Sequence, residues 1–133
     1  MKINTLLFLS FLATMIILSC SKEDCTPSSI NENVIGNWSI KTSAFGFSES
    51  GTGSFNSDGS FNTVPDDLLI SATINGTKLT KMTYKILDST LVLKVSDPNN
   101  SNTSSSLSLD LTKNECDRIS FSLSGLGTAT FSR

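Results

Sequence analysis

The sequence predicts an all-β protein in which the chain forms an antiparallel up-and-down barrel of about eight strands. Apolar and polar residues alternate along most of the chain after residue 34, as in strands with one buried and one solvent-facing side. Short turn signals separate these runs at the spacing of β-hairpins. The chain is also rich in serine and threonine, and no stretch after the first residues has a sustained helical period.

The alternating runs define the expected strands. Their same-face apolar residues are Trp38 and Ile40; Leu68, Ile70, Ala72 and Ile74; Met82, Tyr84 and Ile86; Leu91, Leu93 and Val95; Leu107, Leu109 and Leu111; Ile119, Phe121 and Leu123; and Ala129 and Phe131. Phe55 and Phe61 flank a further short hairpin. Because an open meander leaves two unpaired edges, we expect the sheet to close into a barrel.

Turn-forming residues lie between these runs. The clearest turns are Ser57-Asp58-Gly59, Asn75-Gly76, Asp88-Ser89, Lys113-Asn114 and Ser124-Gly125. The longest polar gap covers residues 97–104, and we expect it to be a loop. Asp88-Ser89-Thr90 also resembles the short O-glycosylation sequon of Bacteroidetes envelope proteins, which makes Ser89 a candidate modification site on an accessible turn.

The N-terminal segment predicts export. Residues 6–18 are apolar apart from Ser10 and Thr14, but a helix that crosses a bilayer needs roughly 20 apolar residues. Residues 1–19 are therefore interpreted as a signal peptide that is removed. Ile17-Leu18-Ser19-Cys20 resembles a bacterial lipobox, which implies that Cys20 is acylated and attaches the mature protein to a membrane.

The residues after Cys20 refine this location. Lys22, Glu23 and Asp24 resemble the surface-export signal of Bacteroidetes lipoproteins. The resemblance implies an outer-membrane lipoprotein displayed at the cell surface. The alternative is a lipoprotein on the periplasmic face of the outer membrane.

Composition divides the mature chain into a tether and one domain. Residues 20–33 contain Pro27, several serines and few apolar side chains, which predicts a lipidated, flexible tether. Residues 34–133 have the size of a single domain, which we expect to be monomeric. Besides Cys20, the chain has Cys25 and Cys116, and an oxidising compartment permits one disulfide between them. The alternative is two free thiols.

Composition also argues against several classes of function. The formal net charge is −2, whereas a nucleic-acid-binding domain needs a basic surface. The chain has no histidine, so it lacks a Ser-His or Cys-His catalytic pair and is poorly supplied with metal ligands. We therefore expect a protein that is not an enzyme and that has no metal and no cofactor.

The domain resembles a known family. Gly36-Asn37-Trp38 matches the G-x-W motif of lipocalins, and the chain from Val34 to Arg133 resembles the small lipocalin-like lipoproteins of Bacteroidetes. The stretches that carry this resemblance are GSFNSDGSF, TYKILDSTLVLKV, LSLDLTKNECDRISF and TATFSR. The family has an antiparallel barrel of about eight strands, which agrees with the periodicity.

The resemblance also implies how one end of the barrel is closed. The family's tryptophan, matched here by Trp38, closes that end, and an arginine from the last strand often packs across it. We expect Gly36 to let the first strand bend around the indole. Arg133 is in register with Ala129 and Phe131, so it matches the stacking arginine; the alternative is a solvated chain terminus.

Three functions follow from these expectations. The family resemblance implies a barrel that binds a small apolar ligand. A barrel with a filled interior would instead bind a protein or a glycan through its loops, as inhibitor-like barrels do. The third possibility is a structural protein of the cell envelope. A barrel of this size can be filled by side chains or can hold one small ligand, so the sequence leaves these functions open.

Overall fold

The computed structural model describes residues 25–133. The signal peptide and the predicted lipidation and export residues, Cys20, Lys22, Glu23 and Asp24, lie outside the described residues. Within residues 25–133, the only helix is a single short turn, and no helix is long and apolar enough to cross a membrane.

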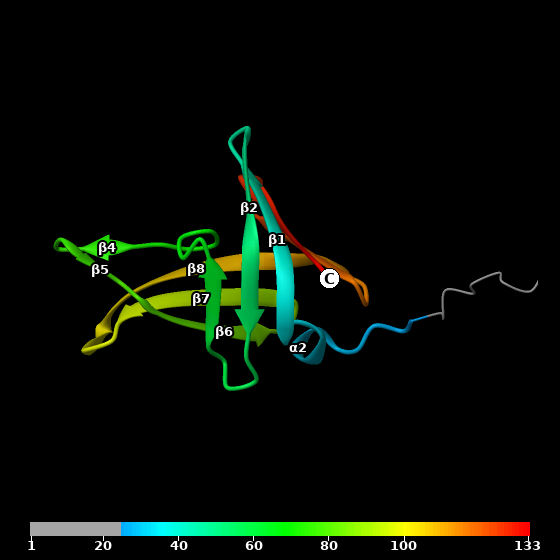
Figure 1. The fold of residues 1–133 in the computed structure, drawn as a ribbon, viewed down its shortest axis with the longest axis horizontal. Coiled ribbons are helices and arrows are strands. Elements are labelled where there is room, and N and C mark those ends of the chain that lie inside the picture. The colour runs from blue at the N-terminus through cyan, green and yellow to red at the C-terminus, as the bar shows by residue number, and fades with distance from the viewer. Residues whose placement is uncertain (1–24) are drawn as a thin grey trace, which may run out of the picture.

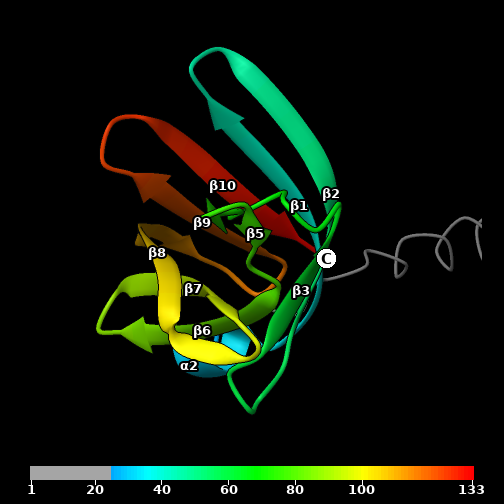
Figure 2. The same ribbon diagram turned by 90° about the vertical axis from the view of Figure 1, so that its left-hand side faces the viewer.

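Eight of the ten strands form one antiparallel sheet that curls into an up-and-down barrel (Figures 1 and 2). The elements in chain order are α2 (Ile30–Asn33), β1 (Gly36–Ala44), β2 (Phe47–Phe55), β3 (Phe61–Val64), β4 (Thr73–Ile74), β5 (Thr77–Lys78), β6 (Lys81–Leu87), β7 (Thr90–Asp97), β8 (Asn100–Asn114), β9 (Arg118–Leu123) and β10 (Gly127–Ser132). The order in the sheet is β3-β2-β1-β10-β9-β8-β7-β6, and β4 and β5 form a separate hairpin. The all-β barrel predicted from the sequence is therefore confirmed.

The barrel is nearly but not fully closed. Its two edge strands, β3 and β6, contact each other at one end only. An isolated bridge joins Ser60 to Thr83, and the backbone N–H of Tyr84 donates to the carbonyl oxygen of Gly59 at 2.7 Å. The Tyr84 hydroxyl donates to the carbonyl oxygen of Asn56 at 2.8 Å. The edges of β3 and β6 are thus held together beside the β2–β3 turn.

The two ends of the barrel differ. We call the end that carries α2, Trp38 and Arg133 the closed end, and the opposite end, with the β1–β2 turn and the β9–β10 turn, the open end. The β1–β2 hairpin extends beyond its neighbours at the open end (Figure 2). Its tip exposes Phe45 and Phe47, which keep 76% and 78% of their surface accessible. These two phenylalanines are therefore large apolar residues with little cover.

Aromatic side chains fill the interior on the side of the closed end. Phe55 stacks on Phe61 with ring centroids 5.3 Å apart, and it contacts Phe131 and Tyr84 at 5.3 and 5.1 Å. Phe131 also packs against Phe121 at 5.3 Å. These rings come from strands far apart in the sequence, so they join the two halves of the barrel. The interior at this end is a packed core rather than a ligand cup.

Thr63 is the one buried side chain whose polar atom lacks a hydrogen-bond partner within residues 25–133. The Thr63 hydroxyl is 5% exposed as a residue and faces the interior opposite Gly53. Replacing Thr63 by valine keeps the shape and removes an unsatisfied polar atom, so we expect the free energy of unfolding to rise by about 1 kcal/mol. Urea melts measure this change. Thr52→Val, on the exposed side of β2, is the control and should give no such gain; a less stable T63V would show that the hydroxyl has a partner.

The structure differs from the sequence prediction in two loops. Residues 68–74 were expected to form a barrel strand, but only Thr73–Ile74 is a strand, and it pairs with β5. Leu68, Leu69 and Ile70 are all buried, because this segment packs against the core without strand alternation. The expected loop at residues 97–104 was also wrong. β7 continues to Asp97 and β8 begins at Asn100, since polar side chains suit strands that face solvent on one or both sides.

Two further boundaries, those of a turn and of the tether, differ from the sequence prediction. The turn predicted at Lys113-Asn114 lies instead at residues 115–117, because β8 extends through Asn114. The flexible tether was predicted to reach residue 33, but residues 30–33 form α2 and pack on the closed end. Ile30, Asn33 and the following Val34 are buried. The folded unit therefore begins before residue 34, because a few apolar residues in a polar stretch are enough to dock it.

Candidate functional site

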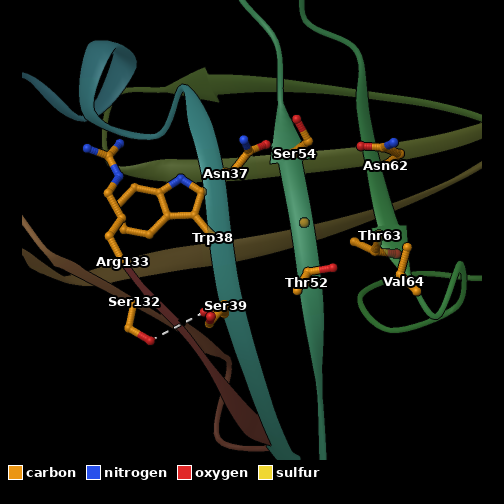
Figure 3. A pocket seen from close by; sticks show the side chains of 11 residues that line it. Asn37, Trp38, Ser39, Thr52, Ser54, Asn62, Thr63, Val64, Ser132 and Arg133 are labelled. Atoms are coloured by element: carbon orange, nitrogen blue, oxygen red, sulfur yellow. Dashed lines mark hydrogen bonds between the residues drawn. The ribbon is translucent and has the colours of Figure 1, made fainter.

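The closed end brings together the three residues predicted to close the barrel. Gly36 has φ +125°, a left-handed conformation that favours glycine, and it begins β1. Trp38 is 2% exposed, and its indole N–H donates to the carbonyl oxygen of Val34 at 2.8 Å. Cζ of Arg133 lies 4.0 Å from the centroid of the Trp38 ring, and Figure 3 shows the two side chains next to each other. This arrangement blocks the closed end, so it is a structural plug rather than an entrance.

Arg133 contacts other groups besides the indole of Trp38. Its Nη2 donates to the carbonyl oxygens of Asn33 and Ile35 at 2.7 and 3.0 Å. Its backbone N–H donates to the carbonyl oxygen of Asp117 at 3.0 Å. The side chain therefore ties the end of β10 to the segment that joins α2 to β1. Sequence analysis proposed the contact with Trp38 but had no signal for these carbonyl partners.

Replacing Arg133 by alanine should lower the free energy of unfolding by about 1 to 2 kcal/mol. The variant loses a cation–π contact and two charge-assisted hydrogen bonds, but these lie at a partly exposed chain end. Denaturant melts measure the loss. Arg133→Lys should recover only part of it, because an ammonium cannot lie flat on the indole while it donates to both carbonyl groups. A lysine variant as stable as the wild type would contradict this geometry.

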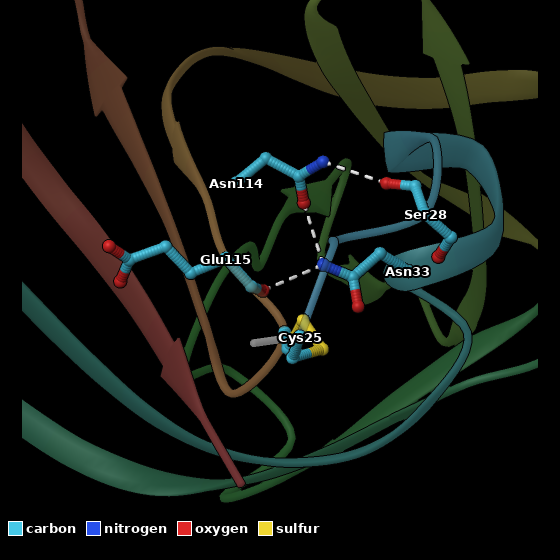
Figure 4. The surroundings of a disulfide bond; sticks show 6 residues. Cys25, Ser28, Asn33, Asn114 and Glu115 are labelled. Carbon is cyan, nitrogen blue, oxygen red and sulfur yellow. Dashed lines mark hydrogen bonds between the residues drawn. A yellow bond between two sulfur atoms is a disulfide. The ribbon is translucent and has the colours of Figure 1, made fainter. Parts of the chain in front are cut away.

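The structure joins Cys25 and Cys116 in a disulfide at the closed end (Figure 4). Their Cα atoms lie 6.2 Å apart, within the usual range for a disulfide. Polar contacts surround the bond: Nδ2 of Asn33 donates to Oδ1 of Asn114 at 2.6 Å and to the carbonyl oxygen of Glu115 at 2.8 Å. Nδ2 of Asn114 donates to the carbonyl oxygen of Ser28 at 3.0 Å. These contacts fix the N-terminal segment on the β8–β9 turn.

The candidate modification site, Ser89, is exposed in the turn between β6 and β7. The alternation of strand directions places this turn at the closed end, together with α2 and the β8–β9 turn. Ser89 therefore lies at the same end of the barrel as the disulfide. It is separate from both of the grooves described next.

A polar groove of about 350 Å³ lies over β1, β2 and β3 (Figure 3). Its lining includes Gly53, which has no side chain, and hydroxyl and amide side chains such as those of Asn37, Thr52 and Asn62. Its one charged lining residue is Arg133, whose guanidinium is already bound at the closed end. The groove is shallow and offers uncharged hydrogen-bonding groups only, so it gives no clear selectivity for a ligand.

A more apolar groove of about 280 Å³ lies at the open end. Its apolar lining consists of Ala44, Phe47, Leu68, Leu69, Leu107, Leu109, Leu123 and Ala129. Five of these eight side chains are leucines, so the groove can remove an apolar molecule from water. The volume is at the lower limit of the usual range for ligand pockets, roughly 300 to 1,000 Å³.

The strand register explains why the groove is open. Ala129 lies opposite Thr42, and Gly127 lies opposite Ala44 and Leu123, so small residues form the inner face of β1 and β10 near the open end. The segment with Leu68 and Leu69 covers the groove from the other side. An ion pair at 2.7 Å between Asp66 and Lys78 holds this segment to β5; it lowers the pKa of Asp66 and raises the pKa of Lys78.

The groove contains few polar groups. Thr42, Ser43 and Thr128 supply hydroxyl groups, and Glu49 supplies a carboxylate. Within residues 25–133, no three His, Cys, Asp or Glu side chains gather in a way that could hold a metal ion. The lining of the groove therefore combines leucine side chains with three hydroxyl groups and one carboxylate.

Comparison with known proteins adds little to this description. No family model matches the chain, and no curated protein matches it. A solved structure described as a redesigned β-barrel is similar, with 18% sequence identity and a TM-score of 0.42, over 80% of this chain and 98% of that chain. The assignment of the fold therefore rests on the strand pairing described above.

Proposed function

We propose that this protein is an outer-membrane lipoprotein of the lipocalin-like type, whose barrel binds a small apolar molecule in the groove at its open end. The observation that supports binding is the leucine-rich groove above a packed interior. Because aromatic rings fill the core below it, the ligand is an alkyl chain or a single ring, rather than a large molecule enclosed in a cup.

Titration calorimetry with n-octanol tests the binding. Octanol has a flexible apolar chain and an uncharged head, so its affinity reports on the groove alone. We expect binding to the wild type and loss of binding in Leu107→Trp, because Leu107 is only partly buried and a larger ring at that position fills the groove. Leu87→Trp is the matched control, since Leu87 is 50% exposed and lies outside the groove. Wild-type protein that gives no heat with octanol would support a filled barrel that acts as a binding module for proteins or glycans, or an envelope structural protein.

The proposed location rests on the residues before the described part of the chain. Ile17-Leu18-Ser19-Cys20 supports acylation of Cys20, and Lys22, Glu23 and Asp24 support display at the cell surface. The structure is compatible with this location in one respect: Cys25 is bonded at the closed end, so the chain enters the barrel on the side opposite the groove. A lipid on Cys20 would then leave the open end facing away from the membrane.

Metabolic labelling with an alkyne fatty acid should mark the wild type and leave Cys20→Ala unlabelled. The matched variant replaces Lys22, Glu23 and Asp24 by alanine. It should keep the label but become less accessible to protease added to intact cells, because the export residues are lost while the acylated thiol remains. Equal labelling of wild type and Cys20→Ala would refute lipidation. Unchanged protease access in the triple variant would place the signal for surface display elsewhere.

A further inference from the structure

Glu49 is the only charged side chain that lines the open-end groove within the described residues. It lies on the inner face of β2, directly opposite Thr42 of β1, which in turn lies opposite Ala129 of β10. These three residues form a row across the sheet that is one step further inside than the row of Phe47, Ala44 and Gly127. The carboxylate is thus placed behind the rim of the groove rather than on the outer surface of the barrel.

Within residues 25–133, no ion pair neutralises this carboxylate. The ion pairs within residues 25–133 are Lys78 with Asp66 and Lys113 with Glu115, and neither involves Glu49. The other polar groups of the groove, Thr42, Ser43 and Thr128, carry hydroxyl oxygens that accept hydrogen bonds as readily as they donate them. An ammonium group carries a positive charge and only donates hydrogen bonds, so every polar group of the groove can accept a hydrogen bond from it. A carboxylate head would meet a like charge.

We propose that the groove selects small amphiphiles with an alkyl tail and an ammonium head, and that Glu49 determines this preference. This inference rests on the proposed function, since the tail must occupy the leucine-lined part of the groove. The tail is held by burial, which is independent of charge, and the head is chosen by the carboxylate. Glu49 is exposed, so solvent screens it and the preference is moderate rather than absolute.

The experiment compares three probes with the same tail: n-octylamine, n-octanol and n-octanoate, at neutral pH and low ionic strength. Calorimetric titration of the wild type should give the tightest binding for the amine and the weakest for octanoate. Each step should be roughly five-fold, the factor that about 1 kcal/mol of attraction or repulsion between solvent-exposed charges produces. Added salt should reduce the differences and leave the affinity for octanol nearly unchanged.

Glu49→Gln tests the residue itself. We expect its affinity for octylamine to fall and its affinity for octanoate to rise by similar factors, while octanol binds as before. Glu32→Gln removes a carboxylate from α2 at the closed end and is the matched control; it should keep the wild-type order. If octanol binds but the amine and octanoate bind equally well, or if Glu49→Gln keeps the wild-type ratio, the inference is wrong and the proposed function stands. If octanol fails to bind, both are wrong.

Discussion

Replacing Trp38 by alanine should lower the free energy of unfolding by about 3 to 5 kcal/mol, the cost of removing a large buried aromatic side chain. The indole is 2% exposed, lies 6.2 Å from the ring of Phe131 and donates a hydrogen bond to Val34. Its loss opens a cavity at the closed end and leaves the guanidinium of Arg133 without its ring. Urea or guanidinium melts of the variant and the wild type measure the difference.

Trp38→Phe separates packing from hydrogen bonding. The smaller ring keeps part of the contact with Phe131 but leaves the Val34 carbonyl group without its indole donor, so its loss should be intermediate. Both variants should still bind octanol, because the groove lies at the other end of the barrel. If Trp38→Ala unfolds at the wild-type denaturant concentration, Trp38 is not a structural plug and the closed end is held by other contacts.

Replacing both cysteines of the Cys25–Cys116 bond by serine should be the other large change, with a loss of roughly 4 to 5 kcal/mol in the chain-entropy model. The two residues are 91 positions apart, so the bond closes a loop that contains β1 to β8. Such a loop strongly restricts the unfolded chain. The double variant avoids the free thiol that either single variant would leave.

Thermal melts with and without a reducing agent measure this effect, and the double variant should no longer respond to reduction. The native contacts of Asn33 with Asn114 and Glu115 should keep α2 docked in the folded variant. The circular dichroism spectrum of the variant should therefore resemble that of the wild type. Non-reducing peptide mapping provides an independent check. Two free thiols in the wild-type protein would contradict the bond itself.

The alternation of apolar residues was enough to predict the fold, but it gave no signal for the strand β2. The inner face of β2 carries Glu49, Gly51 and Gly53 where an apolar residue would normally signal a strand. Glycine is required at position 51, where a side chain would collide with the backbone of Val64; a side chain at Gly53 would displace the end of the Ile40 side chain. The large side chains of neighbouring elements fill the space, so the sequence of β2 has no period-two signal.

The candidate sites were predictable to different degrees. The register of Ala129 and Phe131 with Arg133 suggested that this arginine faces Trp38, and the structure places it there. The open-end groove could not be foreseen, because Leu68 and Leu69 were interpreted as part of a strand rather than as a segment that covers the interior. Glu49 had no motif around it. Its position became informative only when the register placed it opposite Thr42.

The position of the disulfide also determines how tension enters the molecule. Suppose that the membrane pulls on the chain ahead of Cys25. Through the backbone alone, the force would reach Gly36 and separate β1 from β2 one residue pair at a time. The covalent bond instead passes force directly to Cys116 in the β8–β9 turn. The force then reaches the C-terminal strands without passing through residues 26–115, which include β1 to β8.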